Sequence, residues 1–593
     1  MCGIAAFYSN DSKTGLRLSS ITKGLNHRGP DASDCKTFGN YGIGHSRLSI
    51  IDLNDVSNQP FQSINGRYYI VYNGEIYNYK EIRKELESNG CKFKSNSDTE
   101  VILNGFINYG EEIVVKLNGM FSFIIYDNLE RSFFIARDRF GIKPLFYYNK
   151  NNHFWFCSEL KPINENFDLQ TSVEGAVMLL LLGSIPGNRT IYSNVYKFPS
   201  GHYGWLKNGD LNTHLFYNSE FEPKINSSTI NIISSVKTHV ENSIKNHLIS
   251  DAPIGTFLSG GLDSSIITSI ASKEVPNLKT ISVSFEEKKF SEGYFQKLVA
   301  NQYKTDHYDF HITEKIFQDQ FLDYLKIVDQ PNIDGFNTYL ASVMAKKAGL
   351  KAILAGQGAD ELFYSYDTFI TAKKYRQTHL GLRSICNLKK LKTLIQTGSI
   401  PKEFLLYQKV KDLILYLPSR QLFSIKEISK ILRINIESVL DIIKDELSFI
   451  NTNKIRQYDD KVSLFEQKLY LESQLLSKDD VSSMATSLEI RIPFLDNDLV
   501  NYINKINPDI KYNNLVPKIV LAKAFENDLP EELLSRKKKG FSVPYGKWMS
   551  GILDEIDLGN TYKENFKRKE IGWTRYMSTL MLNKFNHNLD LSI

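Results

Sequence analysis

The stretch Pro253-Ile254-Gly255-Thr256-Phe257-Leu258-Ser259-Gly260-Gly261-Leu262-Asp263-Ser264-Ser265 joins an apolar run, a glycine pair and a polar start to a helical pattern. This order predicts a strand, a tight loop and a Ser-capped helix. Such a loop aims backbone N–H groups and a helix N-terminus at an anion, which favours a phosphate site. A tight turn alone would also explain the glycines. The lysine of the P-loop pattern is absent, so a Walker-type site is excluded.

The chain downstream of this loop continues the α/β pattern. Residues 281–285 form a β-branched alternating run, which predicts the next strand, and 353–363 predict a further strand ending in a glycine loop. Strands alternate with helices from about residue 230, and helical patterns dominate after 360. We therefore predict an α/β core with a helical extension over 230–550.

The chain upstream has a different periodicity. Short alternating runs before about residue 205, such as 67–72 and 121–126, are typical of stacked antiparallel sheets. The polar stretch that follows predicts a linker over 206–229. The predicted organisation is thus a first domain at 1–205, this linker, a second domain at 230–550 and a tail at 551–593. Neither the tail nor 370–450 carries a motif of assignable function.

The beginning of the chain, Met1-Cys2-Gly3-Ile4, offers a nucleophile. Removal of Met1, which a small second residue permits, would give Cys2 a free α-amine that titrates near about 7.7–8.0 and could take the thiol proton. A lone cysteine is more often a small buried hydrophobe. The motifs that accompany Cys2 favour the catalytic interpretation.

Five segments follow Cys2 in a fixed order: His27-Arg28-Gly29-Pro30-Asp31, 44–52, Tyr72-Asn73-Gly74-Glu75-Ile76-Tyr77-Asn78, 97–100 and 136–141. Together with Cys2 they resemble the class II glutamine amidotransferase domain, an N-terminal-nucleophile fold, over about 1–205. The resemblance implies an αββα sandwich in which Cys2 attacks the side-chain amide of glutamine.

The resemblance also assigns the residues around that nucleophile. It implies that the Asn73 side chain and the Gly74 backbone N–H, which glycine allows close to the substrate, stabilise the tetrahedral oxyanion. Arg47 suits the α-carboxylate of glutamine and Asp98 its α-ammonium group. Singly, these residues would fit a surface arginine, an Asn-Gly turn and a helix N-cap. The expected glutamine-binding set is Arg47, Leu48, Ser49, Ile50, Ile51, Asn73, Gly74, Glu75 and Asp98.

The glycine-rich loop resembles the pyrophosphate loop of ATP pyrophosphatases, which transfer AMP to an oxygen and release pyrophosphate. The resemblance implies that the loop serines hold the β- and γ-phosphates, and that Asp263 and Asp360 bind Mg²⁺, which prefers carboxylate oxygen. Val283 is expected beside the adenine. The expected ATP-binding set is Leu258, Ser259, Gly260, Gly261, Asp263, Ser264, Ser265, Val283, Ala355 and Gly356.

Three later segments, 476–480, 484–496 and 537–541, resemble asparagine synthetase in particular. The resemblance implies that Lys518 is the cation of the synthetase site, at the start of a helix with proline in its first position. A lysine on a helix is more often merely solvated, and the basic run 536–539 alone would fit a solvated face or a nucleic-acid patch.

Three departures from the family pattern lie near the expected acceptor pocket. Gln357 stands between two glycines where asparagine synthetases carry an acidic residue, Gln330 stands at another usually acidic position, and 363–366 lack an expected glycine pair. A neutral amide can hydrogen-bond but cannot take a proton as a carboxylate does. We expect Gln357 in the acceptor site. These departures therefore bear on the identity of the acceptor more than on that of the nitrogen donor.

The resemblance implies a glutamine-dependent amidoligase that uses ATP and Mg²⁺, with conversion of aspartate to asparagine as the leading reaction and ammonia passing through an internal tunnel. One alternative is an amidoligase acting on another carboxylate, such as a sugar acid or a peptide. A tRNA-modifying pyrophosphate-loop enzyme is an alternative from another class, which the fused glutaminase argues against. A non-catalytic binding or storage protein is the third, which the presence of Cys2, Asp263 and Asp360 disfavours.

Composition limits the partners. The 593 residues include 72 Lys and Arg against 67 Asp and Glu, so the charge balance does not call for nucleic acid or an anionic membrane. No apolar run reaches the roughly 18 residues of a membrane span, and we expect no signal peptide. The five cysteines have no metal-ligand spacing, and their odd number fits a reducing cytoplasm. We expect a cytoplasmic enzyme, with a homodimer as a candidate assembly.

Overall fold

The computed structural model describes residues 2–11, 13–287, 289–373, 412–413, 416–512, 516–536, 543–553, 555–556 and 561–591. The segment 537–541, part of the segment 370–450 and one of the five cysteines, Cys386, lie outside these residues.

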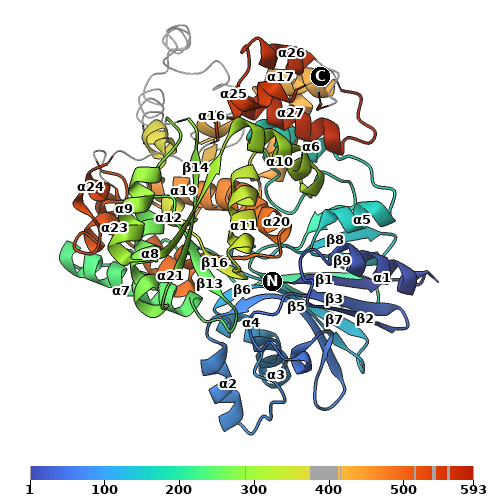
Figure 1. Ribbon diagram of the computed structural model, residues 1–593. Helices are drawn as coiled ribbons and strands as arrows, with labels where there is room; N and C mark the ends of the chain where they lie inside the picture. The colour runs from blue at the N-terminus through green and yellow to red at the C-terminus, as the bar shows by residue number, and fades with distance from the viewer. Residues whose placement is uncertain are drawn as a thin grey trace.

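The N-terminal half contains two antiparallel sheets that face each other (Figure 1). The first has the order β10 (Val195–Lys197), β8 (Phe146–Lys150), β9 (His153–Cys157), β1 (Gly3–Tyr8), β3 (Tyr41–Arg47) and β2 (Ala32–Phe38). The second has the order β12 (Asp210–Leu215), β11 (His202–Lys207), β7 (Ser132–Arg137), β6 (Gly119–Asp127), β5 (Tyr68–Ile76) and β4 (Phe61–Gln62).

Alternation along these strands separates three apolar layers. Ile4, Ile43, Val71 and Ile124 belong to the cluster between the sheets, because successive strand residues point to opposite faces. The outer faces are covered by helices: α1 (Thr14–Gly24), α5 (Leu160–Asn166) and α6 (Val173–Leu182) on the first sheet, and α2 (Tyr79–Ser88), α3 (Asp98–Tyr109) and α4 (Ile113–Lys116) on the second. The predicted αββα sandwich is confirmed.

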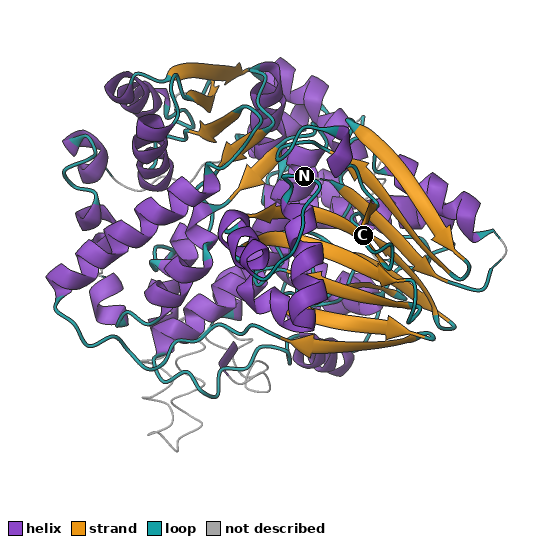
Figure 2. Cartoon of the chain, turned by 90° about the horizontal axis from the view of Figure 1, so that it is seen from below, coloured by secondary structure: helices purple, strands orange, loops and turns teal. Residues whose placement is uncertain are grey.

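The C-terminal half is built on a parallel sheet, as predicted. Its order is β15 (Asp306–Ile312), β14 (Lys279–Phe285), β13 (Ile254–Phe257), β16 (Ala352–Leu354) and β17 (Glu489–Arg491). Figures 1 and 2 show helices on both sides of this sheet, beside the sandwich. The helices around it are α7 (Thr229–His247), α8 (Leu262–Glu274), α9 (Gly293–Tyr303), α10 (Glu314–Ile327), α11 (Phe336–Lys347), α12 (Ala359–Leu362), α21 (Asn497–Asn504), α22 (Pro508–Lys511), α23 (Ile519–Ala524) and α24 (Glu531–Ser535).

The predicted helical extension follows. One helical path runs through α19 (Tyr458–Phe465), a π-helical stretch (Glu466–Leu476) and α20 (Ser477–Met484). The other helices are α16 (Leu417–Arg420), α17 (Ile425–Leu432), α18 (Ile436–Glu446), α25 (Tyr545–Trp548), α26 (Thr561–Lys567) and α27 (Trp573–Phe585). The tail packs back on the first domain, because Ser578 donates to Leu179 O of α6 at 3.0 Å.

Three local expectations differ from the structure. Strand β12 continues the second sheet past residue 205, within the predicted linker. The helix after the glycine loop is not Ser-capped: its N-cap is Gly261, and the hydroxyl of Ser265, one turn inside, donates to Gly261 O at 2.7 Å. Helix α23 begins at Ile519 rather than at a proline, with Lys518 as its N-cap at a φ of 54°.

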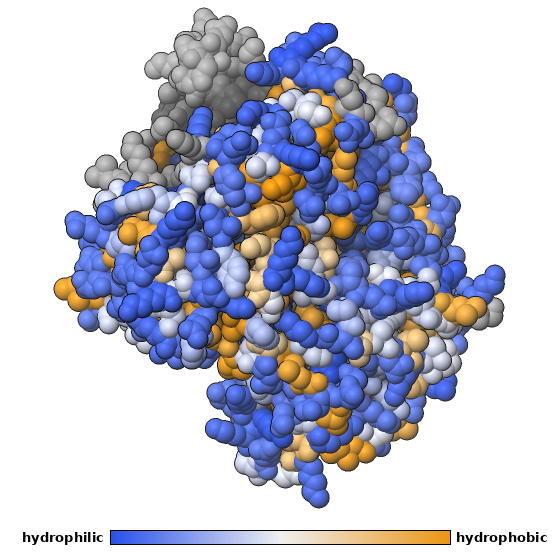
Figure 3. Space-filling model, in the orientation of Figure 1, coloured by the Kyte–Doolittle hydropathy of each residue, from blue (hydrophilic) through white to orange (hydrophobic). Residues whose placement is uncertain are grey.

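The surface is mainly hydrophilic on the face drawn in Figure 3, with hydrophobic residues scattered over it. Exposed large apolar side chains such as Leu16, Leu129 and Ile230 come from separate elements. Among the described residues, no helix is both long and apolar enough to cross a membrane.

Candidate active sites

The predicted nucleophile lies in a small cavity of the first domain. Cys2 precedes β1 in the middle of its sheet and is 8% exposed, and its thiol lies 3.9 Å from Leu48 O. The cavity has a volume of about 30 Å³. Burial raises the pKa of the Cys2 thiol, and the nearby Arg47 acts to lower it. The thiol therefore needs a local base before it can attack as a thiolate.

The predicted oxyanion donors stand beside Cys2 on β5. The Cys2 backbone N donates to Asn73 Oδ1 at 2.9 Å. This contact turns the Nδ2 group of Asn73 the other way, where it is buried without a partner among the described residues. A Cβ at Gly74 would lie 2.1 Å from Met120 O, so only glycine fits there. The unpartnered Nδ2 group of Asn73 suits a developing oxyanion.

The groups expected to bind the two charged ends of glutamine line the same cavity. The Arg47 guanidinium donates to Asn54 O at 2.9 Å and to Asn58 Oδ1 at 2.7 Å. The Asp98 carboxylate accepts from Tyr72 OH at 2.9 Å, and burial raises its pKa to about 6. Both side chains are thus held in place before a ligand arrives.

Seven of the nine residues expected to bind glutamine line the cavity: Arg47, Leu48, Ile50, Ile51, Gly74, Glu75 and Asp98. Ser49 does not, and its backbone N donates to Asp31 Oδ2 at 2.8 Å. Asn73 contacts Cys2 without lining the cavity. Sequence reasoning missed Ser57, Gln59, Tyr72, Ser97 and Thr99. Tyr72, Ser97 and Thr99 stood inside quoted motifs, and this position was the signal that could have identified them.

The second site is a cavity of about 620 Å³ at the carboxyl end of the parallel strands. It is lined by seven residues of the expected ATP set: Leu258, Ser259, Asp263, Ser264, Val283, Ala355 and Gly356. Gly260, Gly261 and Ser265 are absent from this lining. Gly260 makes the turn with a φ of 78°, and Ser265 bonds within its own helix.

The three predicted charged groups of this site converge. Lys518 Nζ lies 2.5 Å from Asp263 Oδ2 and 2.6 Å from Asp360 Oδ1. Burial acts to lower the pKa of Lys518, but the two carboxylates outweigh it and raise the pKa above the usual lysine value. The lysine therefore carries its charge at the mouth of the phosphate loop.

The carboxylates of Asp263 and Asp360 suit Mg²⁺ in addition to the Lys518 ammonium group. Mg²⁺ in nucleotide sites is bound by one or two carboxylates together with phosphate oxygens and water. Within the described parts of the chain, no group of three or more His, Cys, Asp or Glu side chains forms a complete metal cage. Asp263 and Asp360 thus suit an ion that arrives with a phosphate ligand.

The remaining wall of the cavity includes Gln357, one of the positions that depart from the family pattern. Gln357 lines it, and its Nε2 donates to Asp479 Oδ2 at 2.7 Å. Lys478 Nζ lies 3.0 Å from Asp334 Oδ2. Gln330, expected at this pocket, does not line the cavity but a separate small one, 3.4 Å from Ser477 Oγ. Lys478 and Asp479 stood in a quoted motif without an assigned role.

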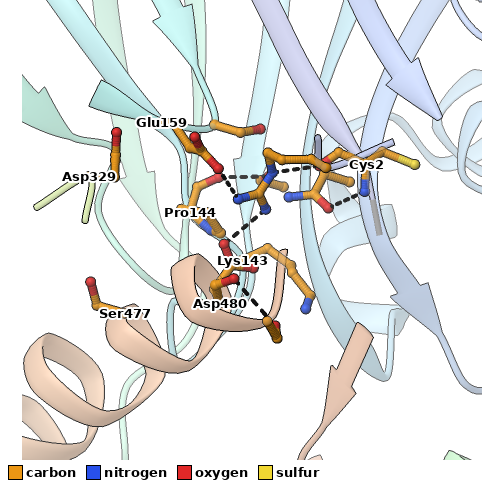
Figure 4. Close-up of polar contacts among 12 residues, drawn as sticks. Cys2, Lys143, Pro144, Glu159, Asp329, Ser477 and Asp480 are labelled. Carbon is orange, nitrogen blue, oxygen red and sulfur yellow. Dashed lines mark hydrogen bonds and ion pairs between the residues drawn. The ribbon is translucent and has the colours of Figure 1, made fainter. Parts of the chain in front are cut away.

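A buried polar network joins the two domains between the cavities (Figure 4). Arg28 Nε donates to Cys2 O at 3.1 Å, while its Nη1 and Nη2 lie 2.7 Å from Glu159 and 2.8 Å from Asp480. Farther along the interface, Arg491 Nη2 lies 2.8 Å from Glu75. The backbone beside the nucleophile is therefore linked directly to α20 of the synthetase domain.

Comparison with known proteins agrees with this division. A family model described as a glutamine amidotransferase domain matches residues 1–217, and one described as asparagine synthase matches residues 235–577. Asparagine synthetase [glutamine-hydrolyzing] 1 of Bacillus subtilis (strain 168) is 32% identical, covering 94% of this chain and 89% of its own. Asparagine synthetase [glutamine-hydrolyzing] 3 of the same organism is 30% identical over 95% of this chain and 91% of its own. Asparagine synthetase B [glutamine-hydrolyzing] of Escherichia coli (strain K12) is 30% identical over 62% of this chain and 64% of its own.

Proposed function

The chain belongs to the asparagine synthase family, and we propose how its two sites divide one reaction, the glutamine-dependent amidation of aspartate. As a member of this family it is a carbon–nitrogen ligase that uses glutamine, aspartate and ATP. Similarity to asparagine synthetases over 94% of the chain does not favour a tRNA-modifying enzyme or a different acceptor.

The first domain releases ammonia. With Met1 removed, the α-amine of Cys2 takes the thiol proton, and the thiolate attacks the side-chain carbonyl carbon of glutamine. Asn73 Nδ2 and the Gly74 N–H stabilise the oxyanion. The collapsing intermediate expels the nitrogen, which takes the proton and leaves as ammonia, and water then hydrolyses the thioester to glutamate. Arg47 and Asp98 hold the two charged ends of the substrate.

The second domain activates the acceptor. A carboxylate oxygen of aspartate attacks the α-phosphorus of ATP, and pyrophosphate leaves into the loop at Ser259 and Ser264. Lys518 balances the charge that develops on the phosphate oxygens. Mg²⁺ bound at Asp263 and Asp360 would neutralise further phosphate charge. Ammonia then attacks the acyl carbon, AMP leaves, and asparagine forms.

The convergence of Lys518, Asp263 and Asp360 at the phosphate loop carries this proposal. Three residues from distant parts of the chain form a charged cluster at the end of the parallel sheet, where ligands of open α/β sheets bind. The Cys2 cavity on the same chain supplies the matching nitrogen source, and the network at Arg28 connects the two.

The proposal also includes the setting of the enzyme. Cys2 works only as a thiol, and Cys35, Cys91 and Cys157 are likewise free thiols among the described residues, which supports a reducing, cytoplasmic location. Assembly as a homodimer is the remaining part, and analytical ultracentrifugation of the purified chain tests it.

The products test the reaction. The full chain supplied with aspartate, ATP, Mg²⁺ and ammonium should yield asparagine, AMP and pyrophosphate in equal amounts, measured by chromatography. Release of ADP would contradict the adenylation step. A preparation that hydrolyses glutamine in a separate assay but forms no asparagine in this reaction would contradict aspartate as the acceptor.

A further inference from the structure

The side chain of Gln357 is held by one partner in a defined direction. Gln357 lies in the loop between β16 and α12, and its Nε2 donates to Asp479 Oδ2 of α20 at 2.7 Å. The second carboxylate oxygen of Asp479 accepts from Thr338 Oγ1 of α11 at 2.7 Å. Asp479 is 2% exposed, so two helices fix this carboxylate in place.

The direction of the amide follows from this partner. An ionised carboxylate only accepts hydrogen bonds, so the NH₂ group of Gln357 must face Asp479 and the carbonyl must turn away. Burial raises the pKa of Asp479, and the Lys478 ammonium group, 3.8 Å away, acts to lower it and so stabilises the ionised form. The Gln357 Oε1 atom is buried without a partner among the described residues, in a side chain that lines the synthetase cavity. A buried, unpaired acceptor is costly unless a ligand donates to it.

The position of Gln357 indicates which substrate donates a hydrogen bond to its carbonyl oxygen. A Cβ at the adjacent Gly356 would lie 3.0 Å from Asp263 Cβ, which places this loop beside Asp263 of the proposed phosphate site. Helix α20 reaches the domain interface one residue after Asp479, where Asp480 pairs with Arg28. Helix α20 therefore contacts both Gln357 and the domain that we propose releases ammonia. Ammonia, the substrate supplied by that domain, carries N–H donors.

We propose that Asp479 is a positioning residue that holds the Gln357 carbonyl toward the cavity, where it accepts a hydrogen bond from ammonia attacking the activated acceptor. The inference rests on the proposed function. One N–H bonded to Oε1 leaves the ammonia lone pair free to point at the acyl carbon. The Gln357 amide orients the attacking ammonia through a hydrogen bond but does not take its proton. A carboxylate at this position could do both.

The isosteric variant Asp479→Asn tests the direction of the amide. With Thr338 still donating to the remaining oxygen, the new NH₂ group faces Gln357 and turns its amide around, so that an N–H rather than a carbonyl faces ammonia. We expect ammonium-dependent asparagine formation to fall about tenfold, the loss of one hydrogen bond made in the transition state, with a higher KM for ammonium. Aspartate-dependent ATP–pyrophosphate exchange should stay within about twofold of the parent, because adenylation does not use this group.

The reciprocal exchange supplies a sharper test. Gln357→Glu alone places two carboxylates in contact and should also slow amide formation. In the double variant Gln357→Glu/Asp479→Asn, the asparagine donates to one glutamate oxygen and the other again faces the cavity. We expect the double variant to recover to within about threefold of the parent, which is a large positive coupling energy. Ser482→Ala, a buried change on the same helix outside the cavity lining, is the control and should alter neither activity.

Three results would overturn the role of Asp479: an unchanged ammonium reaction in Asp479→Asn, an equal loss of exchange and amide formation, or a double variant no better than the product of the two single ones. Failure of the proposed function would look different, because the parent chain itself would then make no asparagine.

Discussion

Replacing Cys2 with alanine is expected to abolish glutamine-dependent asparagine formation and to leave ammonium-dependent formation within about twofold of the parent. In the proposed mechanism Cys2 attacks glutamine, and it lies in a different cavity from the phosphate loop. Loss of a catalytic nucleophile typically costs about 10⁴-fold or more. Parallel assays of asparagine with glutamine and with ammonium chloride as nitrogen donor measure the two effects.

A second cysteine provides the control for that variant. Cys35 lies on β2, partly buried and outside the Cys2 cavity, and Cys35→Ala should keep both activities. If Cys2→Ala lost the ammonium reaction to the same extent as the glutamine reaction, the division of labour between the two sites would be wrong.

The change Asp263→Asn should have the opposite effect, removing AMP formation while sparing glutamine hydrolysis. It deletes a negative charge from a cluster in which Lys518 lies 2.5 Å away and in which Mg²⁺ would bind. Loss of one such electrostatic group costs about 10²- to 10³-fold in the chemical step. Chromatographic analysis of AMP, pyrophosphate and glutamate from one reaction measures both half-reactions.

Asp528→Asn is the matched control, since Asp528 pairs with Lys237 and Lys273 away from the cavity lining. AMP formation at the parent rate in Asp263→Asn would exclude Asp263 from the phosphate site. A parallel loss of glutaminase activity would indicate that the substitution disturbs the whole chain.

Local periodicity explains how much of the fold could be predicted. The strands at 254–257 and 279–285 and the antiparallel runs of the first domain follow from alternation and glycine punctuation, which are properties of neighbouring residues. The end of the second sheet at β12 was missed, because its sequence is polar and most of its residues are exposed. The cap of α8 was also missed, since serines one turn inside a helix look like caps in a sequence.

The candidate sites show the same difference between what neighbouring residues predict and what packing determines. Ordered motifs predicted roles for Cys2, Asp98, Asp263 and Asp360, because each motif carries its chemistry within a few residues. The partners of these groups depend on packing. The bond from Gln357 to Asp479 spans 122 residues and exists because α20 packs against α11 and β17. Gln330 was expected at the same pocket but faces another cavity, since its loop packs toward Ser477.

Transfer of nitrogen from one site to the other is the central claim, and isotope labelling tests it most directly. The full chain is supplied with amide-¹⁵N glutamine, aspartate, ATP and Mg²⁺ in the presence of unlabelled ammonium, and the asparagine is analysed by mass spectrometry. We expect the asparagine amide to carry ¹⁵N well above its proportion in the free ammonium pool, with one AMP formed per asparagine. Asparagine whose label matches the free pool, or ¹⁵N found only in ammonium with no labelled asparagine, would contradict the account.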